Sequence, residues 1–157
     1  MLIQPIGSAD DLAAVRILFQ EYAASLDVDL SYQGFADELA GLPGKYAPPT
    51  GALLIARGDN GDPLACVALR PLTGGSVCEM KRLYVRPAAR GLGLGRRLAE
   101  AIIHVGRGMG YAEMRLDTLP SMAAAIGLYE GLGFSAVEPY YDTPIQGTRF
   151  LGRGLSD

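Results

Sequence analysis

The chain has 157 residues, of which 49% are hydrophobic and 20% charged, and its formal net charge is -3. This composition is typical of one compact domain with enough apolar surface for a core, so we expect a single domain over residues 1–157. The sequence lacks the strong basic excess of nucleic-acid-binding domains, so nucleic acid is not an expected partner. It contains neither a signal-peptide pattern nor an apolar run of membrane-spanning length, so we expect a cytoplasmic protein with no membrane partner.

In its first half the chain combines two predicted helices with several strands. Ser8 begins the first helix, and Asp11 three positions later makes a near capping box. Turn formers at 58–63 and 73–76 separate three apolar runs, which predicts three strands joined by hairpins. The predicted elements are a strand at 2–6, a helix from Ser8, a shorter helix from Ser31 with Phe35, Leu39 and Leu42 buried and an end at Pro43 and Gly44, a loop at 45–50, and strands at 52–57, 64–70 and 77–85.

The second half alternates helices and strands. Leu94, Leu98 and Ile102 recur at helical spacing, which predicts a helix from Leu94 to about Gly108. A strand at 114–118, a helix at 120–132, a strand region from Phe134 and a final strand at about 148–155 follow. This order of elements predicts an α/β fold, with a mixed, strongly twisted sheet and helices on both faces.

The two cysteines and the one histidine do not suggest a metal site. Cys66 and Cys78 fall in adjacent predicted strands, but the hairpin that joins these strands pairs neither with the other. We expect reduced thiols in the core and no metal. His104 lies in the middle of a predicted helix, where we expect a surface or packing residue.

A glycine-rich turn joins the strand at 77–85 to the following helix and indicates an anion site. Gly91, Gly93 and Gly95 alternate there, so the backbone can approach a ligand closely. Three arginines, at positions 90, 96 and 97, surround a helix N-terminus, where positive charge costs roughly 0.3–1 kcal/mol. A bound phosphate or pyrophosphate would reverse that cost, because backbone donors, helix dipole and arginines would all face it.

Two common phosphate-binding motifs do not fit this turn. A dinucleotide fingerprint that begins at Gly91 needs glycine where the chain has Arg96, and one that begins at Gly93 needs a small residue where the chain has Leu98. A P-loop needs Gly-Lys followed by Ser or Thr, and the chain has no such tripeptide. A nucleotide-binding protein with unrelated chemistry is therefore disfavoured.

Three motifs resemble those of the GNAT superfamily of N-acetyltransferases. The run Arg90-x-x-Gly93-x-Gly95 is similar to its acyl-CoA pyrophosphate loop, Gln/Arg-x-x-Gly-x-Gly/Ala. The segment 79–87 resembles the family's fourth strand, and 125–134 resembles its Leu-Tyr-x-x-x-Gly-Phe helix. The element order matches over nearly the whole chain. The resemblance implies a GNAT fold with a mostly antiparallel sheet and acetyl-CoA as co-substrate.

The resemblance also implies where acetyl-CoA binds. The pantetheine arm is expected to pair with the Val85 backbone as an added strand. The Leu83 N–H is expected to point at the thioester carbonyl, where one preorganised donor is worth roughly 2.7–4 kcal/mol. The implied cofactor-binding residues are Leu83, Val85, Arg90, Gly91, Leu92, Gly93, Leu94, Gly95 and Arg96.

Two residues match the family's proton-transfer groups. Glu79 lies eleven residues before Arg90, where several members place a carboxylate that takes the proton of the amine. A lysine-like amine has a pKa of about 10.4, so at neutral pH some group must accept its proton. The alternative is that Glu79 lies on a solvated strand edge or pairs with Lys81 or an arginine. Tyr129 matches the tyrosine that protonates the CoA thiolate; the alternative is a core residue.

The pantetheine contact on one side departs from the family pattern. Many members carry asparagine three residues before the alanine matched by Ala125, and this chain has Met122 there, with Ser121 as a candidate substitute. Lys81 and Arg82 are interpreted as strand-face charges, either of which could meet the 3′-phosphate or an acidic substrate.

Aromatic residues lie where family members usually build the acceptor pocket. They are Tyr22, Tyr32, Tyr140 and Tyr141, the last two next to the loop 142–147. These rings could cage a cation or be ordinary packing. The expected function is acetyl transfer from acetyl-CoA to a primary amine of a small molecule or peptide by direct attack in a ternary complex. The alternative is a non-catalytic acyl-CoA sensor of the same fold, and the resemblance makes a homodimer a candidate assembly.

Overall fold

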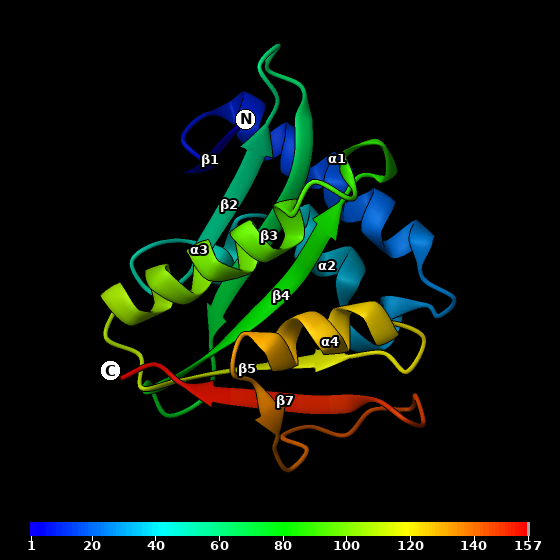
Figure 1. The fold of residues 1–157 in the computed structure, drawn as a ribbon, viewed down its shortest axis with the longest axis vertical. Helices are drawn as coiled ribbons and strands as arrows, with labels where there is room; N and C mark the ends of the chain where they lie inside the picture. Colours follow the sequence, from blue (N-terminus) through cyan, green and yellow to red (C-terminus); the bar gives the residue numbers. More distant parts are fainter. Residues whose placement is uncertain (157) are drawn as a thin grey trace.

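The computed structural model describes residues 1–156. Its centre is a seven-stranded sheet in the order β1-β2-β3-β4-β5-β7-β6 (Figure 1). Neighbouring strands run antiparallel except β4 and β5, which run parallel. The expected mixed, mostly antiparallel sheet is therefore confirmed. The strands are β1 (Leu2–Pro5), β2 (Ala52–Arg57), β3 (Pro63–Pro71), β4 (Val77–Val85), β5 (Glu113–Thr118), β6 (Ser135–Ala136) and β7 (Arg149–Gly154).

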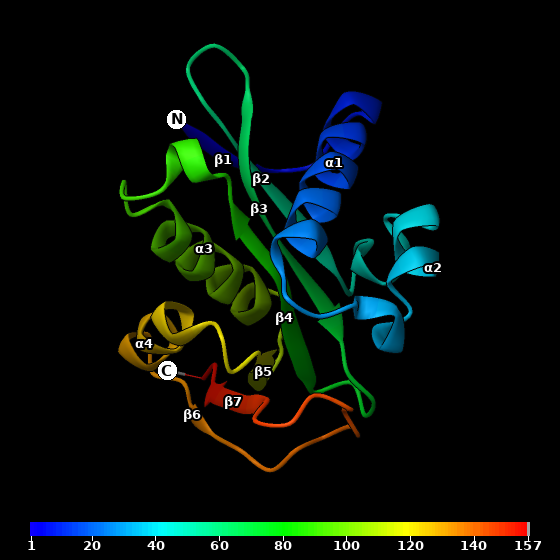
Figure 2. The same cartoon turned by 90° about the vertical axis from the view of Figure 1, so that its right-hand side faces the viewer.

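Helices cover both faces of the sheet, as expected from the sequence. Figure 2 shows α1 and α2 on one face and α3 and α4 on the other. Across residues 1–156, no helix is both long enough and apolar enough to span a membrane. The helices are α1 (Ala9–Ser25), α2 (Phe35–Ala40), α3 (Leu94–Gly108) and α4 (Ala123–Gly131).

Each face of the sheet has its own apolar core. Leu98 and Ile102 of α3 pack on one face, and Leu18 and Phe19 of α1 pack on the other. Strand β2 contributes to both cores, because its side chains alternate between the two faces and almost all of them are buried. Burial on both faces explains why this strand is a continuous apolar run in the sequence.

The predicted cap of α1 is present. The Ser8 hydroxyl accepts a hydrogen bond from the Asp11 N–H at 3.1 Å. The Asp11 carboxylate in turn accepts one from the Gly7 N–H at 2.9 Å and pairs with Arg57 at 2.8 Å. The Gly7 bond and Arg57 hold the pKa of Asp11 below its usual value. This reciprocal bonding fixes where the chain leaves β1 and enters the helix.

Two predicted helices have different bounds in the structure. The predicted helix from Ser31 is broken at Gly34, whose φ of 70° is left-handed, into a 3₁₀ turn at Leu30–Gln33 and α2. Helix α4 begins at Ala123 rather than Pro120, because the Met122 N–H closes a turn onto the Leu119 carbonyl. Both cysteines are buried and free, and His104 is exposed, as predicted.

Candidate active site

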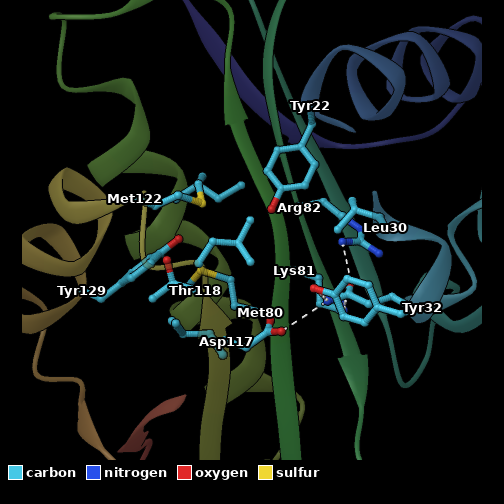
Figure 3. Close-up of a pocket in the computed structure, with 14 residues that line it drawn as sticks. Tyr22, Leu30, Tyr32, Met80, Lys81, Arg82, Asp117, Thr118, Met122 and Tyr129 are labelled. Carbon is cyan, nitrogen blue, oxygen red and sulfur yellow. Dashed lines mark hydrogen bonds between the residues drawn. The ribbon is translucent and has the colours of Figure 1, made fainter. Parts of the chain in front are cut away.

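The site lies where the two parallel strands of the sheet separate. Strands β4 and β5 pair only over Val77–Glu79 and Glu113–Arg115. Beyond Glu79 the two strands diverge, and a narrow pocket of about 30 Å³, the junction pocket, opens between them (Figure 3). Its lining includes Tyr22, Tyr32, Gln33, Lys81, Arg82, Leu83, Asp117, Thr118, Met122 and Tyr129.

A bulge in β4 sets the direction of the side chains around this pocket. The pairing of β4 with β3 shifts register between Cys66 and Ala68, and opposite them Arg82 has a φ of 59°. The extra residue changes the alternation, so that Met80 before the bulge and Leu83 after it both face the α3 core. The bulge therefore interrupts the strand at the residue before Leu83.

Arg82 connects this bulge to α2 and to the 3₁₀ turn before it, on the face of the sheet opposite α3. Its guanidinium is almost fully buried and donates to both oxygens of Glu38, at 2.9 and 3.0 Å. It also donates to Gln33 Oε1 at 2.9 Å and lies over the Phe35 ring. Burial alone would lower the pKa of Arg82, but Glu38 raises it above its usual value. The ion pair fixes the 3₁₀ turn and α2 against β4.

The glycine-rich loop lies at the N-terminus of α3. Gly93 occupies the N-cap position with a φ of 75°, and no side chain caps this helix end. Gly91 also has positive φ, and a Cβ at either glycine would meet no atom within 4 Å. Leu92 is 63% exposed, and Arg90 and Arg96 are exposed as well. Free helix amides, open backbone and positive side chains therefore face the same solvent region.

Contacts beside the loop hold the end of β4. Arg90 Nε donates to the Val85 carbonyl at 3.0 Å. Leu94 is buried, and the position of a Cβ on Gly95 would touch the Val85 side chain at 3.7 Å. Helix α3 thus packs closely on β4 at the point where the loop begins.

Tyr129 and Thr118 line the junction pocket on the side of α3 and α4. Tyr129 is 7% exposed, and its ring packs edge-on against Phe134 at 5.9 Å. Burial, with smaller contributions from Tyr22 and Asp117, raises the pKa of the Tyr129 phenol well above its usual value. The Thr118 hydroxyl is buried without a hydrogen-bond partner. Met122 lines the same pocket at the start of α4, while Ser121 bonds Asp27 at 3.4 Å instead.

Glu79 is one of the most buried residues in the structure. Its side chain is 1% exposed, and Arg70 Nε donates to Oε1 at 2.7 Å. The Tyr140 hydroxyl donates to Oε2 at 2.6 Å. Of the two placements considered from the sequence, the structure shows the pairing with an arginine, and that arginine is Arg70. Burial and Glu79 together raise the pKa of Tyr140.

A second cavity, the side pocket, adjoins the junction pocket on the face of α1 and α2. Its volume is about 250 Å³. Tyr32, Gln33 and Lys81 line both pockets, so these three residues form the boundary between them. The lining of the side pocket is Tyr32, Gln33, Glu38, Lys45, Arg70, Leu72, Thr73, Glu79, Lys81, Tyr140 and Tyr141.

Asp117 closes a polar network between the pockets. It accepts hydrogen bonds from the Tyr141 hydroxyl and from Gln33 Nε2, both on Oδ2. Gln33 Oε1 accepts from Lys81 Nζ at 3.2 Å. One amide therefore joins a lysine to an aspartate at the boundary of the two pockets.

The structure places the predicted aromatic residues around the two pockets and adds residues that the motifs do not predict. Tyr22, Tyr32, Tyr140 and Tyr141 all line one or both pockets. These additional residues are Gln33, Arg70, Asp117 and Thr118. For Asp117 and Thr118 the sequence contained one indication of a role in the site. They end a strand that runs parallel to β4, so they lie at the same edge of the sheet as the end of β4, where acetyl-CoA is expected to bind. Gln33 and Arg70 had none, because their positions depend on a turn and a register known only from the fold.

Comparisons with known proteins agree with this geometry. The model of the acetyltransferase (GNAT) family matches residues 15–134. An uncharacterized N-acetyltransferase of Schizosaccharomyces pombe is 44% identical over 154 residues, 98% of this chain and 94% of that protein. A solved Klebsiella pneumoniae protein described as an acyl-CoA N-acyltransferase has a TM-score of 0.77 at 26% identity, covering 99% of this chain and 97% of that one.

A further solved structure shows the same fold with a ligand. The protein yncA of Salmonella typhimurium, solved with its cofactor acetyl-CoA, has a TM-score of 0.71 at 22% identity and covers 100% of this chain and 95% of its own. The names of these relatives are those of enzymes, which favours an enzyme over a sensor module. The chain therefore belongs to the acetyltransferase (GNAT) family and is an N-acetyltransferase.

Proposed function

We propose that this chain transfers the acetyl group of acetyl-CoA to a primary amine by direct attack, with both substrates bound between β4 and β5. The observation that carries the proposal is that the junction pocket is lined from both faces of the sheet. Thr118 and Tyr129 line it on the α3 and α4 side, and Tyr32 and Lys81 line it on the other. A thioester on one face and an amine on the other would meet there without a covalent enzyme intermediate.

The pyrophosphate of acetyl-CoA is assigned to the loop before α3. The residues from Arg90 to Arg96 supply uncapped helix amides, backbone without steric obstruction at Gly91 and Gly93, and exposed positive charge. All three favour the same dianionic group. On binding, Arg90 would exchange the Val85 carbonyl for a phosphate oxygen.

The pantetheine arm and the thioester are assigned to the end of β4. From Met80 to Val85 this strand has no pairing with β5, so its edge is available to an added strand that pairs with Val85. Leu83 follows the bulge, and we assign its N–H to the thioester carbonyl as that oxygen becomes an oxyanion.

Tyr129 and Glu79 are the proposed proton-transfer groups. The Tyr129 phenol is protonated at neutral pH, as its raised pKa requires, and we assign to it the proton that the departing thiolate gains. Glu79 is the proposed base. Because Arg70 and Tyr140 occupy both of its oxygens, the proton of the amine would reach it through the Tyr140 phenol or a water molecule.

Calorimetric titration of the unmodified protein with acetyl-CoA, CoA and ATP tests this proposal first. We expect saturable binding of acetyl-CoA and CoA and none of ATP. The second step is an assay of thiol release from acetyl-CoA with a mixture of primary amines, with an amine-free sample as control. Binding without amine-dependent thiol release, or equal binding of ATP, would contradict the proposal.

A further inference from the structure

The charges of the side pocket are unevenly paired. Arg70 pairs with Glu79, and Arg82, which lines the junction pocket, pairs with Glu38, so these four charges compensate one another. Two cations of the lining remain, Lys45 and Lys81. Among residues 1–156, no carboxylate lies within 4.0 Å of the ammonium group of either lysine. The pocket thus has excess positive charge on a chain whose net charge is -3.

Lys81 is the more confined of the two lysines. It is half-buried, lines both pockets, and makes its only hydrogen bond within the described chain to the neutral amide of Gln33. Burial, together with the charge of Arg82, lowers the pKa of Lys81, although Glu79 and Asp117 oppose this shift. A partly desolvated ammonium without a counterion is a poor structural element and a good anion-binding group.

Asp117 supplies the opposite charge one amide away. Gln33 donates to Asp117 Oδ2 while it accepts from Lys81, so the two charges lie at opposite ends of one side-chain amide. Within residues 1–156, Oδ1 of Asp117 has no hydrogen-bond donor. Asp117 lines the junction pocket, where the thioester is assigned, and Lys81 lines both this pocket and the adjoining side pocket. A ligand that lies across the boundary of the two pockets would therefore meet a carboxylate near the reacting atoms and an ammonium on the side-pocket side.

We infer that the acceptor is an amino acid or a similar amine that carries a carboxylate, which binds Lys81 at the side pocket while its amine lies beside Asp117. This inference rests on the proposed function. The amine nitrogen forms the bond to the acetyl carbon as the carbon–sulfur bond breaks. The nitrogen loses one proton to the base, and the thiolate gains one from Tyr129, so CoA leaves as the thiol.

The same charges disfavour a polycationic acceptor. An acceptor with several ammonium groups needs several free carboxylates, and both carboxylates of the side pocket are already neutralised by arginines. A second positive charge on the acceptor would instead face Lys45 and Lys81. Spermidine and kanamycin are therefore the probes that would contradict the inference.

The test is a thiol-release assay on matched acceptors. Each of the common L-amino acids is compared with its α-carboxamide, and spermidine and kanamycin are included. We expect kcat/KM for the best amino acid to exceed that for its carboxamide at least about tenfold, because a charge-assisted bond is lost. The carboxamide has the less basic amine and more of it is unprotonated at neutral pH, so amine protonation cannot produce a preference for the carboxylate.

Lys81→Met identifies the group responsible. This variant keeps an unbranched side chain, one atom shorter, and removes its charge, and we expect the carboxylate-to-carboxamide ratio to fall at least about fivefold, mainly through KM. Acetyl-CoA affinity measured by calorimetry serves as the test of correct folding. The matched control is Arg149→Met, which removes an exposed positive charge on β7, away from both pockets, and should leave the ratio unchanged.

The outcomes separate this inference from the proposed function. If acetyl-CoA does not bind, the proposed function fails, and the inference fails with it. If acetyl-CoA binds but carboxamides, spermidine or kanamycin are acetylated as well as any amino acid, or no amino acid is acetylated, the inference alone is overturned. An unchanged ratio in a Lys81→Met protein that binds acetyl-CoA normally would also overturn it.

Discussion

The two halves of the active site are built in different ways. The cofactor half comes from one continuous stretch, residues 83–97, and offers mainly backbone groups: a strand edge, a glycine loop and a helix N-terminus. The acceptor half is assembled from several segments that are separate in the sequence and offers side chains, which are joined by ion pairs and hydrogen bonds. Backbone conformation should therefore control cofactor binding, whereas side-chain networks should control acceptor chemistry and local stability.

The largest effect expected from this difference concerns the buried ion pair of the acceptor half. Arg82→Met removes the ion-pair partner of Glu38 and one of the two donors to Gln33 in a mostly buried place, and breaking such a pair costs about 3 kcal/mol. We expect that decrease in the free energy of unfolding, measured by urea denaturation. The double variant Arg82→Met with Glu38→Met should recover more than half of it, because no unpaired charge remains.

A matched control comes from the cofactor half. Arg96 pairs with Glu100 on the surface of α3 at 3.9 Å, with both side chains more than half exposed. Arg96→Met should change the free energy of unfolding by less than about 0.5 kcal/mol. Equal losses in the two single variants would mean that the acceptor half does not depend on its buried pair.

The next largest effect concerns the proposed base. Glu79→Gln should lower kcat about 100-fold at pH 6. The loss should shrink as pH rises towards the pKa of the amine, about 10.4 for a lysine-like acceptor, because the free amine no longer needs a base. Glu113→Gln is the control, since Glu113 also pairs with an arginine, Arg115, on β5 but lies outside both pockets. A loss that is the same at every pH would remove Glu79 from proton transfer.

The contrast between the halves also explains how much the sequence predicts. The turn at 91–95 is a contiguous motif, and its glycines and arginines carry the physical reasons for anion binding in the order in which they occur. The hydrophobic spacing of α3 and the cap at Ser8 are equally local. The mixed sheet and the placement of helices on both faces followed from the order of these elements.

The acceptor half depends on contacts between residues far apart in the sequence, which no local pattern predicts. Gln33 meets Asp117 across 84 positions of sequence, and Tyr140 meets Glu79 across 61. The break at Gly34, where a helix was predicted, is what turns Gln33 towards β4. The bulge at Arg82 likewise could not be predicted from the sequence, because no glycine marks it. This arginine adopts positive φ while its guanidinium is bound by Glu38. Tertiary contacts decide both features.

A smaller effect is expected for the proposed acid. Tyr129→Phe should lower kcat by roughly 30-fold. This loss is smaller than the rate enhancement that a general acid usually contributes, because a thiolate is a good leaving group. Burial raises the pKa of this phenol, so Tyr129 should stay protonated up to about pH 10, near the pKa of a free tyrosine. The wild-type kcat should therefore not fall between pH 7 and about pH 10 through ionisation of this residue. The measurement is a pH profile of kcat with saturating substrates.

Tyr111→Phe is the control for that substitution. Tyr111 is also a buried tyrosine, but its hydroxyl donates to the Thr50 carbonyl at 2.6 Å, outside both pockets. This variant should lose about 1 kcal/mol of stability and keep its kcat. If Tyr129→Phe behaves in the same way, Tyr129 is a core residue and not an acid.

The smallest effect tests the claim that backbone conformation controls the cofactor half. In Gly93→Ala the new Cβ meets no atom, so any effect comes from its φ of 75°, which costs an alanine about 1–2 kcal/mol. The free loop would leave this conformation, and acetyl-CoA would have to restore it, which weakens its affinity about tenfold in calorimetry. Gly108→Ala, in the same helix with ordinary φ and open space, should not weaken it. If the two variants bind alike, the arginines rather than the backbone hold the pyrophosphate, and the difference between the two halves disappears.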